Sequence, residues 1–177
     1  IAHFGVWHDA LTQSEVRALM TASTYAEAIV KGGSTPRAYY LLEANANDSV
    51  GTQNGTLTSG AVIAGDKACL PNGLDLSSNA MSAQCFTGRG VALDGSADYL
   101  TAVDSGFNLT STGGAFAVWV KASSISADSH FIMEMANTFR FGVYRVAGYF
   151  KVSALGTGSY FGVASTSIIV PGLWYHV

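Results

Sequence analysis

The sequence predicts an all-β fold, an antiparallel β-sandwich with one or two short helices near its N-terminus. Of the 177 residues, 20 are glycine and only 12% are charged, while Thr, Val, Tyr and Phe are frequent. This composition is typical of short strands joined by tight turns. Apolar residues also alternate with polar ones in short runs bounded by glycine. With 49% hydrophobic residues, the chain can bury one ordinary core.

The first thirty residues predict a strand followed by two helices. Residues 1–7 form a short apolar strand, and Thr12 and Glu15 then make a capping box, the signature of a helix start. Apolar residues follow at helical spacing, at Val16, Leu19 and Met20. A second helix is expected over residues 24–31, with Gly32 ending it in a left-handed conformation.

Residues 90–121 carry the clearest strand signals. Two extended apolar stretches flank Asp94–Gly95, a turn pair that tolerates positive φ, so we expect them to pair as a hairpin. Residues 116–121 then alternate, which predicts a sheet with one drier face. One face would hold Phe116, Val118 and Val120, and the other Ala117, Trp119 and Lys121.

Four further strand signals follow in the last third of the chain. Ala147–Gly148 and residues 156–158 supply tight turns between them, so the pattern predicts an antiparallel meander in one curved sheet. The expected strands cover residues 130–135, 139–146, 149–155 and 160–164.

Three motifs in this order resemble those of laminin-G-type domains, which have the concanavalin A-like jelly-roll fold. They are LDGSADYL (93–100), FAVWVK (116–121) and GLWYHV (172–177). The resemblance implies a concanavalin A-like antiparallel jelly-roll β-sandwich over residues 38–177. The opening segment IAHFGVWHDALTQSEVRAL is similar to the strand and helix that end such a domain.

This order suggests a domain organisation that is out of register with the family. Residues 1–33 are expected to be the C-terminal strand and helix of a preceding laminin-G-like unit, with a linker at 34–37. Residues 38–177 would be the N-terminal part of the next unit, truncated at its C-terminal end. We therefore expect a tandem or intermolecular arrangement; the alternative is that residues 1–33 fold back to complete the same sandwich, as in a circular permutation.

Charge and motifs exclude several function classes. A net charge of −3 without a basic cluster argues against nucleic acid and against an anionic membrane as partner, and no apolar run reaches the ~20 residues that span a bilayer. Nucleophile-elbow, phosphate-loop and zinc-protease motifs are missing from the sequence. A retaining glycosidase needs two carboxyl groups about 5 Å apart, whereas Glu134 has no acidic neighbour two or four positions away. We therefore expect no enzyme activity.

Metal and thiol chemistry leave alternatives open. Asp48, Asn47 and Asn54 lie in one polar loop and could hold calcium through oxygen ligands, although such residues also simply build turns. Asp94 and Asp98 lie in a second such loop. Cys69 and Cys85 form either a disulfide or two small buried thiols, and zinc is not expected.

Aromatic residues offer a further possibility, a platform on which sugar rings stack, but aromatics in a sandwich are more often core. The candidates are Trp7, Tyr144, Tyr149, Tyr160 and Trp174.

The resemblance implies a non-catalytic module for surface adhesion or decoration. Such domains bind glycan or protein, and similar units occur on phage particles and bacterial surfaces, which places this chain on a virion surface or outside the cell. Its expected partners are a glycan or surface protein and other virion or surface subunits, in an oligomer or a tandem repeat. The alternatives are a structural spacer repeat without a ligand and, last, a polysaccharide-degrading enzyme.

Overall fold

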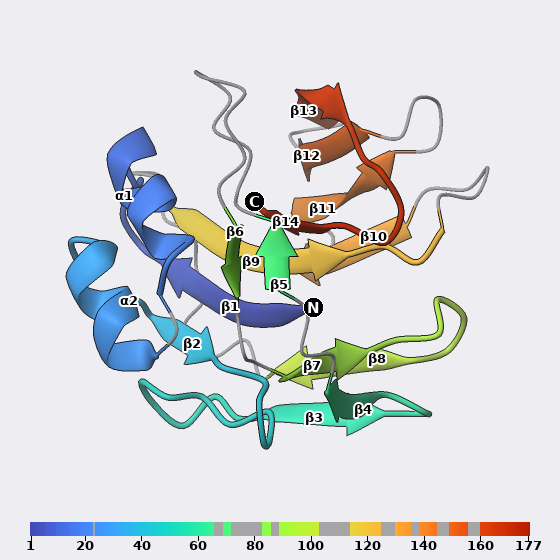
Figure 1. Cartoon of the computed structure of the whole chain (residues 1–177), viewed down its shortest axis with the longest axis horizontal. Coiled ribbons are helices and arrows are strands. Elements are labelled where there is room, and N and C mark those ends of the chain that lie inside the picture. Colours follow the sequence, from blue (N-terminus) through green and yellow to red (C-terminus); the bar gives the residue numbers. More distant parts are fainter. Residues whose placement is uncertain are drawn as a thin grey trace. The chain divides into compact units, whose positions relative to one another are not determined.

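The computed structural model describes residues 1–22, 24–65, 69–71, 83–85, 89–102, 114–124, 130–135, 139–144, 149–155 and 160–177. Within these ranges the chain is mostly strand, with two short helices, α1 (Gln13–Leu19) and α2 (Tyr25–Lys31) (Figure 1). Every strand pairing with a defined register in these ranges is antiparallel. The predicted all-β class with helices near the N-terminus is therefore confirmed.

The chain divides into two compact units. The first unit contains Ile1–Val120 and Trp174–Val177, and the second contains Lys121–Leu173. The strands of the first unit are β1 (Ala2–Trp7), β2 (Ala38–Tyr40), β3 (Gly55–Thr58), β4 (Val62–Gly65), β5 (Cys69–Pro71), β6 (Ala83–Cys85), β7 (Arg89–Ala92), β8 (Tyr99–Ala102), β9 (Ala115–Lys121, whose last residue falls in the second unit) and β14 (Trp174–His176). Those of the second unit are β10 (His130–Met135), β11 (Phe139–Tyr144), β12 (Tyr149–Leu155) and β13 (Tyr160–Ile168).

The main sheet of the first unit has the order β14-β9-β1-β2, so the N-terminal strand lies in its interior. Val6 is opposite Phe116 of β9 on one side and Ala38 of β2 on the other. The backbone amide of Arg37 also donates to the carbonyl of Val6 at 2.6 Å. Within this chain, β1 therefore pairs with β2 and β9, as the fold-back alternative expects. The assignment of residues 1–33 to a preceding unit, with a linker at 34–37, stays a prediction. Backbone pairing favours the fold-back alternative, because a central strand satisfies its donors and acceptors on both edges. Whether the two segments descend from successive repeats stays a prediction.

Both helices pack on one face of this sheet, as the blue elements of Figure 1 show. The N-terminal caps formed where the sequence indicated: Thr12 accepts from the amide of Glu15, whose carboxylate accepts from the amide of Thr12 at 2.6 Å. The left-handed residue after α2 is Gly33, with φ of 68°, whereas Gly32 is right-handed. The predicted conformation was therefore one residue early.

The core under the helices is built around Trp7, which is 1% exposed. Gly5 lies in the same strand beneath two rings: a Cβ built there would lie 2.5 Å from the indole of Trp7 and 2.8 Å from the ring of Tyr39. Only glycine fits this position without displacement. The buried residues of this cluster are Trp7, Leu19, Ala22, Ala28, Tyr39 and Ala117.

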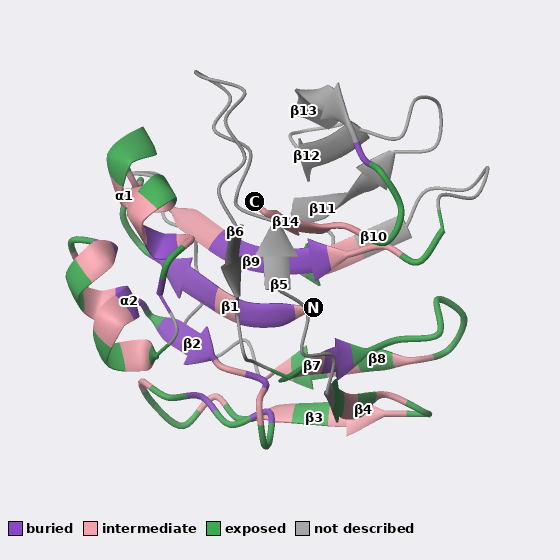
Figure 2. Ribbon diagram, viewed as in Figure 1, coloured by how far each residue is buried: buried purple, intermediate pink, exposed green. Residues whose placement is uncertain are grey.

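Strand β9 is buried on both faces. Residues 117–120 are each 5% exposed or less, so both alternating sets of side chains are covered (Figure 2). The prediction of one drier face is wrong for this strand, because helices cover the side that would otherwise meet solvent.

The remaining strands of the first unit form two-stranded pairs: β3 with β8, β4 with β7, and β5 with β6. The expected hairpin across Asp94–Gly95 is therefore wrong, because β7 and β8 pair with different partners. Gly95 does take the positive φ expected of it, at 79°. Strand β7 also reaches the main sheet, since Ile1 and Val91 exchange backbone hydrogen bonds of 3.0 and 2.8 Å.

The second unit is the predicted meander, with strand order β10-β11-β12-β13. Strands β10 and β12 have the predicted bounds, and β13 extends beyond its predicted end to Ile168. Strand β11 covers Phe139–Tyr144, and residues 145–146 of the predicted strand lie outside the described residues. The predicted turns at 147–148 and 156–158 lie outside the described residues.

Candidate functional site

Asp48 organises the loop between β2 and β3. Its side chain is buried, at 7% exposed. Oδ1 accepts from the backbone amides of Tyr39 and Val50 at 3.1 and 3.0 Å. Oδ2 accepts from the amides of Gly51 and Gln53 at 3.1 and 3.4 Å. One carboxylate thus satisfies four backbone donors, which lets an irregular loop pack against the end of the sheet.

The asparagines of this loop act in the same way. Asn54 Oδ1 accepts from the amide of Asp48 at 3.0 Å, and Asn45 Oδ1 accepts from the amide of Asn47 at 2.9 Å. The structure therefore brings Asp48 and Asn54 together, while Asn47 takes part through its backbone. Carboxylate and amide oxygens suit calcium, and calcium binding at Asp48, Asn47 and Asn54 stays a prediction. In the described ranges no group of three or more His, Cys, Asp or Glu side chains is placed to hold a metal.

Asp98 joins two further loops. Its Oδ1 accepts from the amide of Gly60 at 2.6 Å, and its Oδ2 accepts from the amide of Asp94 at 3.1 Å. The first contact is to the turn between β3 and β4, and the second lies within the segment between β7 and β8. We call these two segments, residues 59–61 and 93–98, the loop pair. Because charge-assisted hydrogen bonds are the stronger kind, Asp98 fixes one loop against the other.

Asp94 gives the longer loop its internal shape. Its Oδ1 accepts from the amides of Ser96, Ala97 and Asp98 at 2.8, 3.2 and 3.4 Å. Hydrogen bonds from these backbone amides, chiefly that of Ser96, hold the pKa of the Asp94 carboxyl below its usual value. The turn on the other side contains Ser59 at a positive φ of 65°. Both loops are thus held in defined conformations by local bonds.

Exposed apolar side chains gather at the loop pair. Val62, Leu93 and Tyr99 are 55%, 38% and 50% exposed, and each lies in or directly beside the two loops in the sequence. On strand β8, Tyr99 is opposite Thr58, and Thr101 is opposite Thr56. Opposite residues share a face, so the phenol ring of Tyr99 lies among threonine side chains. Sequence reasoning identified the aspartates of this region but missed Tyr99 as a surface residue.

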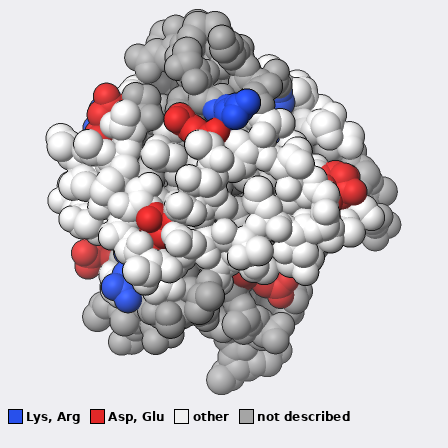
Figure 3. Space-filling model, turned by 90° about the horizontal axis from the view of Figure 1, so that it is seen from below, with Lys and Arg blue, Asp and Glu red and all other residues white. Residues whose placement is uncertain are grey.

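The surface seen in Figure 3 is mostly uncharged, with acidic and basic side chains scattered over it. Such a surface favours a neutral ligand over a polyanion, because nucleic acid binding relies on clustered Lys and Arg.

A second polar cluster, which sequence reasoning missed, lies under α2. His3 is 3% exposed, with its Nδ1 at 3.2 Å from the Tyr39 hydroxyl and its Nε2 at 3.5 Å from Glu43 Oε1. Burial lowers the pKa of His3 to about 4, against the opposing charge of Glu27. Burial also raises the pKa of Tyr39, with Glu27 and Glu43 adding to it. The ring of His3 is therefore neutral at pH 7, and Tyr39 keeps its proton.

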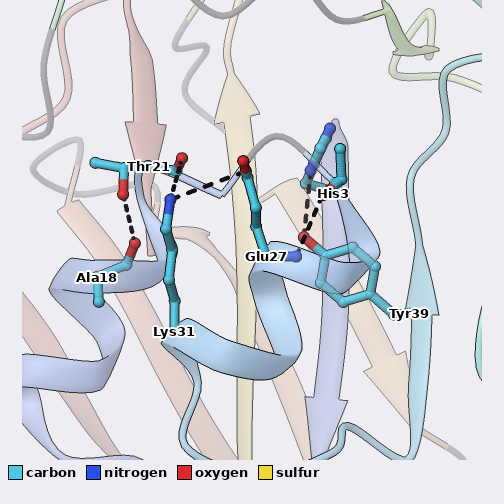
Figure 4. A network of polar contacts seen from close by, with 7 residues as sticks. His3, Ala18, Thr21, Glu27, Lys31 and Tyr39 are labelled. Carbon is cyan, nitrogen blue, oxygen red and sulfur yellow. Dashed lines mark hydrogen bonds and ion pairs between the residues drawn. The ribbon is translucent and has the colours of Figure 1, made fainter.

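The same cluster fastens the two helices (Figure 4). Lys31 Nζ donates to the carbonyl of Thr21 at 2.6 Å and lies 3.9 Å from Glu27 Oε2. Thr21 Oγ1 in turn donates to the carbonyl of Ala18 at 2.9 Å. Because His3 is enclosed and these contacts link neighbouring elements, the arrangement is suited to stabilising the helix layer. The only sequence signal was one histidine within an apolar strand.

The remaining predicted residues fall in different places. Trp7 is core, with its indole donating to the carbonyl of Ser34 at 3.2 Å, and Trp174 is partly buried against Trp119. Neither forms an exposed sugar platform, and the side chains of Tyr144, Tyr149 and Tyr160 lie outside the described part of the chain. Glu134 is exposed and stands opposite Arg140, a basic residue.

Comparisons with protein-family models, curated proteins and solved structures found no match to this chain. Among the described residues, no helix is long and apolar enough to cross a membrane.

Proposed function

We propose that this chain is a non-catalytic adhesion or decoration module, a jelly-roll β-sandwich that binds glycan or protein through the loop pair. The antiparallel strands and the motifs LDGSADYL, FAVWVK and GLWYHV support this laminin-G-like assignment. The resemblance also supports a place on a phage particle or bacterial surface, beside other surface subunits.

The observation that carries the proposal is the half-exposed ring of Tyr99 beside loops that Asp98 holds together. An exposed aromatic ring offers an apolar face for the C–H groups of a sugar, and its hydroxyl and the neighbouring threonines offer hydrogen-bond partners. Fixed loops bind with a smaller loss of conformational entropy than mobile ones. The mostly uncharged surface matches a neutral glycan better than a charged polymer.

Two alternatives differ in what they predict for binding. A structural spacer has the same fold but no ligand, so it shows no selective binding. A polysaccharide-degrading enzyme releases reducing ends; the basic residue opposite Glu134 gives no support for the paired carboxylates that this chemistry requires.

The test is an array of bacterial surface polysaccharides and animal glycans probed with the labelled protein. We expect selective binding that falls at least tenfold in Tyr99→Ala. Val30→Ala is the matched control, because Val30 is an apolar side chain that is 80% exposed on α2, away from the loop pair in the sequence. Its replacement measures how much binding depends on exposed apolar surface in general. Equal binding by wild type and Tyr99→Ala would contradict the proposal, as would the lack of any selective signal.

A further inference from the structure

The backbone places the two cysteines of the chain directly opposite each other. Strands β5 and β6 pair antiparallel, with Cys69 opposite Cys85, Leu70 opposite Gln84 and Pro71 opposite Ala83. The sequence contains only these two cysteines, so each has one possible partner within the chain.

This register meets the distance requirement of a disulfide. Directly opposed residues of antiparallel strands have Cα atoms about 4.5 or about 5.5 Å apart, depending on the hydrogen-bonding position. A disulfide joins residues whose Cα atoms lie about 4.4 to 6.8 Å apart. Opposed residues also share one face of the pair. In both cases the Cα separation lies within the range that a disulfide spans.

The pairing of these two strands is also short, so a covalent link would add to its stability. Each strand has three residues, and an isolated two-stranded ribbon of this kind is marginally stable in water. Pro71 removes one backbone donor from β5. A cross-link that closes residues 70–84 into a loop would stabilise the pairing, because it lowers the conformational entropy of the unfolded chain.

We propose that Cys69 and Cys85 form an intramolecular disulfide that clasps β5 to β6. The oxidant is a small-molecule or protein disulfide of an oxidising compartment. The thiolate of one cysteine attacks that disulfide, forms a mixed disulfide with one half of the oxidant and releases the other half as a thiolate. The second cysteine then attacks the mixed disulfide and releases the remaining half of the oxidant. The two cysteines lose two protons and two electrons, and the oxidant becomes two thiols. The clasp forms in an oxidising environment such as the periplasm or the outside of the cell. It rests on strand register and is independent of ligand binding at the loop pair.

The test is alkylation of the full chain after refolding with a glutathione redox couple. The unfolded protein is treated with iodoacetamide before or after reduction, and its intact mass is measured. We expect no label before reduction and two labels after it, with a monomer on a non-reducing gel. Two labels without reduction would overturn the proposal, and so would a disulfide-linked dimer.

Thermal melting provides the matched stability test. Reductant should lower the melting temperature of the wild type by about 5 to 10 °C, the shift expected for opening a loop of about fifteen residues. The double variant Cys69→Ser/Cys85→Ser should have a melting temperature close to that of the reduced wild type, and reductant should not change it. If reductant leaves the wild-type melting unchanged, the clasp does not stabilise the fold. The alkylation result stands even where the variant fails to fold.

Discussion

Replacing Asp48 with alanine should destabilise the first unit strongly. The substitution removes both acceptor oxygens and leaves the amides of Tyr39, Val50, Gly51 and Gln53 without them. The Tyr39 contact is buried, whereas the other three are partly buried and can be replaced in part by water. Losing a buried partner costs about 1 to 3 kcal/mol, so the sum should be about 3 to 4 kcal/mol. That is a large share of the roughly 5 to 15 kcal/mol by which domains are stable.

Urea denaturation followed by tryptophan fluorescence measures this change. Asp9→Ala is the control, because Asp9 is an exposed carboxylate whose loss should change the free energy of unfolding by less than about 0.5 kcal/mol. Asp48→Asn should fall between the wild type and Asp48→Ala, because its amide keeps one acceptor oxygen. A loss below about 0.5 kcal/mol in Asp48→Ala would refute the role assigned to this carboxylate.

Three further predictions concern pH, packing and metal. Burial lowers the pKa of His3 to about 4 and that of His176 to about 3, so folding favours the neutral rings. The stabilisation from the neutral rings should be complete above about pH 6.5. It should be lost as pH falls to about 4 for His3, by about 3 kcal/mol, and as pH falls to about 3 for His176. Urea denaturation between pH 7.5 and 4.5 measures this dependence of the free energy of unfolding on pH. The variant is His3→Asn, because asparagine tolerates the left-handed backbone of residue 3. An equal dependence on pH in the wild type and in this variant would contradict the role of His3. Gly5→Ala should cost about 2 to 3 kcal/mol, because its methyl group would overlap the indole of Trp7; unchanged thermal melting would show that the site can relax. The calcium hypothesis predicts that calcium raises the melting temperature of the wild type and not that of Asp48→Ala, and identical melting with calcium and with chelator would remove the site.

Local signals in the sequence predicted local structure well. Thr12 and Glu15 lie three residues apart and form their capping box within one turn, so no distant contact can change it. Strands β10 and β12 likewise took their predicted bounds, because alternation and flanking turns define a strand from within.

Pairing between distant segments could not be predicted in the same way. The turn at Asp94–Gly95 suggested a hairpin, but both flanking strands found partners among residues 55–65. The place of β1 beside β9 also depends on a strand about a hundred residues away. A periodic pattern shows that a strand forms and which residues alternate, but it does not name the neighbouring strand.

The candidate sites show the same difference between local signals, which the sequence reveals, and contacts between distant residues, which it does not. The loop aspartates were found because Asp, Asn and Gly cluster in the sequence. The His3 cluster was missed because its partner Tyr39 is 36 residues away. The exposure of Tyr99 was missed for a different reason. Alternation in the sequence shows which residues share a face of a strand, but it does not show which of the two faces meets solvent.

The most direct test of the proposed function is nuclear magnetic resonance mapping of the bound ligand. A glycan selected on the array would be titrated into the isotope-labelled protein while the backbone amide signals are recorded. We predict that the largest shifts occur at residues 59–61 and 93–99, with small changes along α2. Shifts centred on α2, or uniform changes without a site, would contradict binding at the loop pair.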